Sequence, residues 1–263
     1  MRKEIKKLFA VAMSTLLAVS VSGCTQKTPQ QIYEAAIEKN QSLKDQDISM
    51  QMSMGMDLGE ESGSVNITMD VDNKITGNQT DDIKYLMEGK MEMLGMEIPI
   101  TAFYTDGYYY TETLGQKIKY AMDLEDIAKQ ASSIEKLPQS EYLSEITAEK
   151  DGTDTHLTFT MDGERLSDFV EELLKDSALS GLMNGVEETP FEIQGVSGDM
   201  TVGKDGYYHD MNMTIQMQMQ VDEGSTVQMV IDLACQVNNP GQAVEITLPD
   251  TADYQDMSAA TTE

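Results

Sequence analysis

The sequence contains few of the residue types on which most enzyme chemistry depends. It has no tryptophan, two cysteines, two histidines, and 18 lysines and arginines against 46 aspartates and glutamates, for a net charge of −28. A polyanion of this kind repels phosphate, which excludes nucleic acid as a partner. No HExxH, CxxC, GxSxG or glycine-rich phosphate loop occurs. We therefore predict a protein that is not an enzyme and that carries no cofactor and no metal.

The N-terminal segment is typical of a lipoprotein signal peptide. Four basic residues among the first seven precede an uncharged stretch of 14 residues, 8–21, which is too short to span a bilayer at about 20 residues. The next residues, Val21-Ser22-Gly23-Cys24, resemble the bacterial lipobox, in which small residues precede a cysteine that receives lipid. We predict that residues 1–23 are removed and that Cys24, carrying palmitate-type chains, anchors the protein on the extracytoplasmic face of the bacterial cell membrane. The alternative is an ordinary signal peptide that is cut elsewhere.

Most of the remaining chain alternates between apolar and polar residues. Alternation with period two predicts antiparallel strands with one buried face and one wet face, here over 47–58, 65–71, 83–93, 211–221 and 227–237.

Three shorter segments have apolar residues at helical spacing. They predict helices over 29–43, 124–136 and 166–178, the first of which begins with a capping box at Thr28. We expect an α+β fold in one domain, 29–250: a long, strongly curved antiparallel sheet, or incomplete barrel, with about three helices on its concave face. A lipidated tether over 24–28 precedes this domain, and a flexible polar tail over 251–263 follows it.

The remaining reactive side chains do not form a recognisable site. Asp70–Ile75 resembles the start of a calcium loop, but a lysine and an isoleucine occupy positions that need an oxygen ligand and a glycine. The alternation places Cys235 on the apolar side of its strand, and lipid on Cys24 would leave it no disulfide partner. We expect His156 to be solvated and His209 to lie near a hairpin end. Carboxylates are so numerous that counting cannot exclude a glycosidase-type pair, although a platform of aromatic residues for a sugar is lacking.

Methionine is unusually abundant, with 21 residues, and the alternation places 13 of them on the apolar side of strands. Methionine is flexible and polarisable, so a surface lined with it adapts to apolar ligands of varying shape. The candidate ligand-binding residues are Met50, Met52, Met54, Met87, Met91, Met213, Met217 and Met219. Two interpretations stay open: either a cavity or groove persists over this face, or the helices fill it and the methionines are ordinary core.

The chain as a whole resembles a known group of proteins. The lipobox, the N-terminal helix, the long meander and the closing run Val244–Asp250 are similar to the LolA/LolB and LppX/LprG-like superfamily and to related Gram-positive lipoproteins of unknown function. This resemblance implies a half-barrel that carries lipids or lipoproteins, without a binding motif that transfers residue by residue. The leading hypothesis is a lipid-anchored protein that binds a lipid or another hydrophobic ligand. The alternative is a structural or interaction module of the cell envelope, with a filled core and an envelope protein as its partner.

Overall fold

The structure is a computed structural model, and it describes residues 27–57, 63–78, 80, 82–124, 126–127, 138–167, 191–222 and 225–258. Within these residues the chain forms one sheet and two complete helical elements. The elements are α1 (Pro29–Gln41), β1 (Gln46–Asp57), β2 (Ser64–Thr76), β3 (Lys84–Met93), β4 (Met96–Thr105), β5 (Tyr108–Thr113), β6 (Gln116–Ala121), the 3₁₀ helix η1 (Ser140–Tyr142), β7 (Leu143–Asp151), β8 (Asp154–Met161), β9 (Phe191–Val202), β10 (Tyr208–Asp222), β11 (Ser225–Val237) and β12 (Gln255–Asp256).

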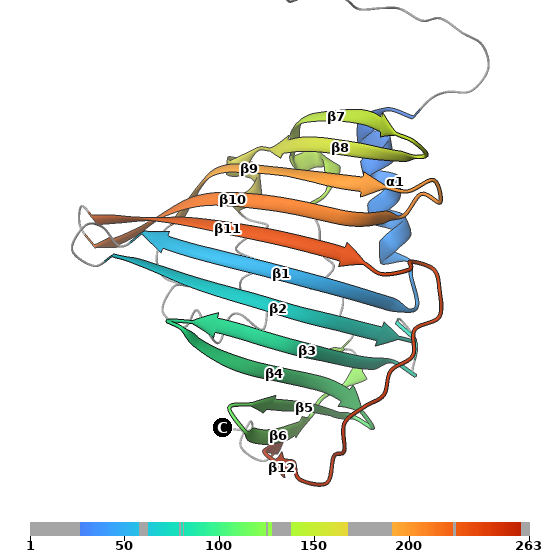
Figure 1. Cartoon of the computed structure of the whole chain (residues 1–263), viewed down its shortest axis with the longest axis vertical. Coiled ribbons are helices and arrows are strands. Elements are labelled where there is room, and N and C mark those ends of the chain that lie inside the picture. Colours follow the sequence, from blue (N-terminus) through green and yellow to red (C-terminus); the bar gives the residue numbers. More distant parts are fainter. Residues whose placement is uncertain are drawn as a thin grey trace, which may run out of the picture.

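The sheet is built from two meanders that meet in its middle. Strands β1 to β6 follow one another toward one edge, β7 to β11 follow one another inward from the other edge, and β11 pairs with β1 (Figure 1). All neighbours are antiparallel except β12, which pairs in parallel with β6. The sheet is therefore open, with β7 at one edge and β12 at the other.

The expected set of three helices on the concave face is wrong. Among the described residues only α1 and the single turn η1 are complete helices, and one sheet forms most of the fold. The other two predicted helices, 124–136 and 166–178, lie largely outside the described residues, and their described positions, 124, 126–127 and 166–167, are helical. The error has a physical cause: helical spacing identifies an apolar stripe, but it fixes neither the length of a helix nor the surface that the stripe covers.

Helix α1 begins where the sequence predicts. The Thr28 side chain accepts from the backbone amide of Gln31, whose own side chain accepts from the amide of Thr28, so both partners of the capping box are present. At the other end of the helix, buried Asn40 donates to the carbonyl of Tyr208 at 2.9 Å and accepts from its amide at 3.0 Å. These bonds fix α1 beside β10, at the end of the sheet formed by β7 to β10 (Figure 1).

The chain after β11 packs against the sheet. Residues 238–256 cross from β11 to β12 past one end of the strands that lie between them (Figure 1). Tyr254 is buried against Phe103 and Tyr110, with ring centroids 5.6 and 5.1 Å away. Residues 251–256 of the predicted polar tail therefore belong to the packed structure. We call 238–256 the C-terminal strap.

Candidate functional site

The strand register places the candidate methionines on one face of the sheet, which we call the inner face. One row of inner-face residues crosses from β7 to β4, each paired with the next: Ile146, Phe159, Gly198, Met213, Leu233, Met52, Met69, Met91 and Ile98. The neighbouring rows contain Met50 and Met54. All eight candidates share the inner face because strand side chains alternate strictly between the two sides.

Most of these methionines are shielded from water. Six of the eight are buried, with exposed fractions from 2% to 8%: Met52, Met54, Met91, Met213, Met217 and Met219. Met50 and Met87 are half-buried. The inner face is thus an apolar surface shielded from water, and few of its methionine side chains contact solvent.

The buried residues of the inner face form two clusters rather than one. The methionine cluster lies on β1 and β8 to β11 and is rich in thioethers, with Met200 and Met217 among its most buried members. The tyrosine cluster lies on β2 to β5 and contains Tyr85, Tyr104 and Tyr109. The two clusters are separate within the described part of the chain, so the core is divided along the sheet.

Several apolar residues of the described inner face belong to neither cluster, and three of them lie on adjacent strands at the boundary. These three are Met50 on β1, Val71 on β2 and Met91 on β3, which we call the seam. Met50 pairs with Val71, and Met91 lies in the adjacent row opposite Met69. At the seam, described residues of the inner face belong to neither the methionine cluster nor the tyrosine cluster.

The methionine cluster is supported by α1. Tyr33 of α1 packs edge-on against Phe159 of β8, with ring centroids 5.4 Å apart, and its hydroxyl donates to the carbonyl of Pro138 at 2.8 Å. Burial raises the pKa of Tyr33 well above its ordinary value. The neutral phenol is therefore the form that the fold requires.

The tyrosine cluster has an internal polar contact. Tyr85 donates to the Asn73 side chain at 3.2 Å, and both residues are buried. Burial, followed by the nearby Tyr109, raises the pKa of Tyr85 well above its ordinary value. The tyrosine rings lie at fixed angles to one another, with Tyr85 and Tyr109 stacked at 6.4 Å.

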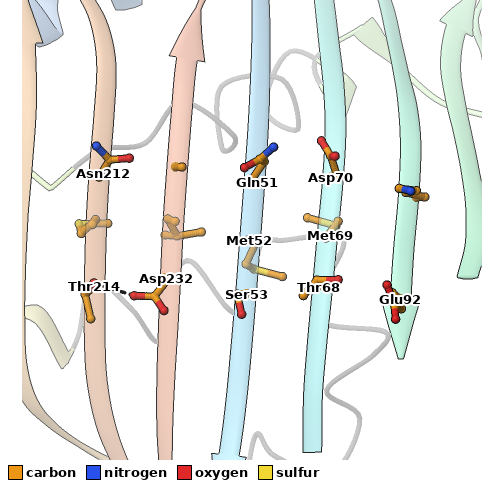
Figure 2. A pocket seen from close by; sticks show the side chains of 14 residues that line it. Gln51, Met52, Ser53, Thr68, Met69, Asp70, Glu92, Asn212, Thr214 and Asp232 are labelled. Carbon is orange, nitrogen blue, oxygen red and sulfur yellow. Dashed lines mark hydrogen bonds between the residues drawn. The ribbon is translucent and has the colours of Figure 1, made fainter. Parts of the chain in front are cut away.

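A hollow of about 410 Å³ lies on the opposite, outer face, over β10, β11, β1, β2 and β3 (Figure 2). Its walls are side chains of that face: Gln51, Ser53, Thr68, Asp70, Lys90, Glu92, Asn212, Thr214, Asp232 and Ala234. Inner-face residues such as Met52 and Met69 lie between them along the strands and form the floor. The small Ala234 stands in register between Asn212 and Gln51, which lowers the surface there.

The walls of the hollow are already partly paired. Thr214 donates to Asp232 at 2.6 Å, and Asn212 donates to Asp199 at 3.0 Å. Lys90 donates to Glu97 at 2.8 Å. The carboxylates outnumber the single lysine among the wall residues, so the hollow disfavours anions.

The remaining predicted residues show no reactive arrangement. His209 lies 3.3 Å from Asp205 near the β9–β10 turn, as expected for a hairpin end, and Cys235 is half-buried on β11. Cys24 lies outside the described residues. Within the described part of the chain, no three histidine, cysteine, aspartate or glutamate side chains are grouped to hold a metal ion. No described helix is both long and apolar enough to cross a membrane.

Comparison with known families covers nearly all of this fold. Residues 28–256 match a family described as a family of unknown function, DUF6612. The chain belongs to that family. No curated protein matches the chain.

Solved structures similar to this member of the family include LppX and a LolA superfamily protein, two groups named in the resemblance. LprF from Mycobacterium bovis is 12% identical, with 84% of this chain and 96% of that chain covered and a TM-score of 0.43. LppX from Mycobacterium tuberculosis is 9% identical, with coverages of 82% and 96% and a TM-score of 0.41. A LolA superfamily protein from Nitrosomonas europaea is 9% identical, with coverages of 84% and 96% and a TM-score of 0.24. At this level the likeness concerns the fold and does not identify a ligand.

Two features of the family member's site were not found from its sequence. The seam depends on how the side chains of three strands pack, and period two reports only which face each residue occupies. The hollow depends on Ala234 meeting Asn212 and Gln51 from other strands, which requires the register. A small residue in a run of polar outer-face positions was the only local signal.

Proposed function

We propose that this protein is an extracytoplasmic lipoprotein, anchored at Cys24, that holds a lipid or another apolar ligand on the methionine-lined inner face of its sheet. The division of the core at the seam is the observation that carries the proposal. A ligand chain placed along Met50, Val71 and Met91 would lie between the methionine and tyrosine clusters.

The chemistry of the seam suits such a ligand. Methionine has three rotatable bonds and a polarisable sulfur, so Met50 and Met91 can change rotamer to fit chains of different shape. An apolar site that is shielded from water favours a hydrocarbon ligand, because no hydrogen bonds have to be broken on its entry. A ligand chain would enter at half-buried Met50 and reach buried Met91.

Membrane attachment would come from the N-terminal segment. Two acyl chains on Cys24 suffice for stable anchoring, whereas one chain is marginal. A tether over 24–28 would join the fold at the capped start of α1, which lies beside β7 (Figure 1). The proposal involves no catalytic step.

Extraction of the purified protein tests the ligand. Protein produced from residue 25 onward contains every described element and lacks the anchor. We expect organic solvent to release a stoichiometric hydrophobic molecule that mass spectrometry detects, and we expect fluorescent fatty acids to bind. If neither is observed, the ligand proposal is wrong.

Substitutions at the seam locate the site. Met50→Gln places an amide in the apolar seam and is expected to weaken fatty-acid binding about tenfold, because that amide loses water when the ligand binds. Gln51→Met is the matched control, since it changes the adjacent residue on the same strand but faces the outer side. Equal binding by both variants and the parent would place the ligand elsewhere.

Labelling of cells with a radioactive fatty acid tests the anchor separately. We expect Cys24→Ala to leave the chain uncleaved and without the lipid that a radiolabelled fatty acid otherwise reveals. Unchanged labelling would contradict lipidation at Cys24 and leave the ligand proposal standing.

A further inference from the structure

Two hairpin turns of the sheet share an unusual sequence. The β3–β4 turn consists of Leu94-Gly95 and the β5–β6 turn of Leu114-Gly115. The φ angles are 53° and 76° in the first turn and 52° and 75° in the second. Positive φ at both central residues is the type I′ arrangement, which favours Asn-Gly because asparagine tolerates the left-handed region better than leucine. The same unfavourable residue occurs at the same position in both turns.

These leucines are also the most exposed large apolar side chains of the described residues. Leu94 and Leu114 are each 70% exposed, and Met96 beside the first turn is 56% exposed. The next most exposed, Leu124, reaches 40%. Both turns lie on the same side of the sheet, at the left in Figure 1. The protein therefore presents two separate apolar points where both backbone strain and water exposure disfavour leucine.

One lysine–glutamate pair lies behind each turn, and behind the first turn Glu92 also lies opposite Glu97. Lys90 contacts Glu97 at 2.8 Å across the first hairpin, and Lys117 contacts Glu112 at 3.6 Å across the second. Although the chain has a net charge of −28, each turn thus has a paired lysine nearby, Lys90 before the first turn and Lys117 after the second. If the tip of a turn enters a bilayer, its leucine reaches the acyl region while the lysine amine stays at the level of the phosphates.

We propose that the two turns insert Leu94 and Leu114 into the surface of a lipid bilayer with zwitterionic headgroups. A fluid acyl layer accepts two separate points without complementary pockets. The two turns lie at different levels along the strands. Thr113 at the end of β5 pairs with Ile100 in the interior of β4 rather than with Met96, the first residue of β4. The strong negative charge of the chain disfavours anionic lipid. This contact depends on neither Cys24 nor an inner-face ligand.

Vesicle binding tests the proposal with protein produced from residue 25 onward. We expect it to float with phosphatidylcholine vesicles and to bind less well when phosphatidylglycerol is added. The double variant Leu94→Asn, Leu114→Asn removes both exposed apolar side chains. It also gives each type I′ turn a residue that tolerates positive φ better. We expect an unchanged or raised melting temperature and a loss of vesicle partitioning of about a hundredfold, roughly tenfold for each leucine. Val230→Thr, at a 38% exposed position of β11, is the control and should bind normally.

The absence of tryptophan provides a second readout that does not require loss of binding. We expect the single variants Leu94→Trp and Leu114→Trp to shift their fluorescence to the blue with phosphatidylcholine vesicles, and Val230→Trp to show no shift. The proposal is overturned if the parent does not bind these vesicles, if the double asparagine variant binds as well as the parent, or if neither turn tryptophan shifts.

Discussion

The two ends of the inner face are packed with different side chains. At the β8–β11 end, flexible thioethers such as Met200 and Met217 fill the core, and α1 covers it through Tyr33. At the β3–β6 end, rigid rings fill it, and the centroids of Tyr109 and Tyr120 lie 5.5 Å apart. Rings with two side-chain torsions pack in few ways, whereas methionine adapts.

The outer faces of the two ends differ as well. Over β3 to β6 the C-terminal strap buries a second aromatic cluster, so this end is packed on both sides. Over β10, β11, β1, β2 and part of β3 the outer face is polar and contains the hollow (Figure 2). One end of the sheet is therefore held from both faces by rigid rings, while the other is held from one face by side chains that adapt.

The largest expected effect comes from the strap side. Phe103 is fully buried and stacks on Tyr110, with centroids 4.6 Å apart. We expect Phe103→Ala to lower the free energy of unfolding by about 3–5 kcal/mol, measured by urea denaturation, because it removes a ring from a packed cluster. Val230→Ala on the outer face of β11 is the control, with an expected change within about 0.5 kcal/mol. Similar losses in both variants would remove the distinction between the outer faces.

Two strand glycines compare the seam with the methionine end. A Cβ at Gly89 of β3 would lie 2.2 Å from the Asp70 carbonyl oxygen, whereas at Gly198 of β9 it would lie 2.6 Å from both the Phe159 ring and the Asn212 carbonyl oxygen. We expect both alanine variants to lose about 1–3 kcal/mol in thermal or urea unfolding. Gly89→Ala should lose more, because its closest contacts include only backbone and a β-branched side chain.

The controls for this pair lie at open positions. A Cβ at Gly55 or Gly195 meets nothing within 4 Å. Alanine there should be neutral or slightly stabilising, since it restricts the unfolded chain. A larger loss for Gly198→Ala than for Gly89→Ala would contradict the view that the methionine end adapts more readily.

How far the sequence predicts this fold depends on the signal. Period two placed Met52, Met213 and the other candidates on one face, because the pleat forces that outcome. It could not place β1 beside β11, a pairing between residues such as Ile48 and Val237 that are far apart in the chain. The strap was missed because Tyr254 is one aromatic residue in a polar segment, and only tertiary packing gives it a partner.

Alkaline pH tests the aromatic end next. Burial is the first cause of the raised pKa of Tyr85, Tyr104 and Tyr120, and the folded state therefore keeps these phenols protonated. Their contribution to stability is complete below the unfolded pKa of about 10 and is lost as the pH rises from there toward the folded pKa. We expect the free energy of unfolding, measured in urea from about pH 8 to pH 11, to fall above about pH 10.

A single substitution sharpens this test. Tyr85→Phe should reduce the alkaline slope by up to about 1.4 kcal/mol per pH unit, because one proton no longer dissociates on unfolding. It should also lower stability near neutral pH by about 1–3 kcal/mol, since buried Asn73 loses its donor. An unchanged slope would show that Tyr85 does not require its neutral form in the fold.

The smallest expected effect is at the methionine end. Met213 is 8% exposed and lies between Leu233 and Gly198 in the central inner-face row. If the thioethers pack adaptably, Met213→Leu should change the free energy of unfolding by less than about 1 kcal/mol, because the volume is conserved and neighbouring methionines can adjust. The same change should narrow the range of fatty-acid lengths that bind, since leucine has fewer rotamers. A loss above about 1.5 kcal/mol would mean that the methionines interlock as rigidly as the rings. In that case the two ends would be alike and the seam would lose its support as a ligand site.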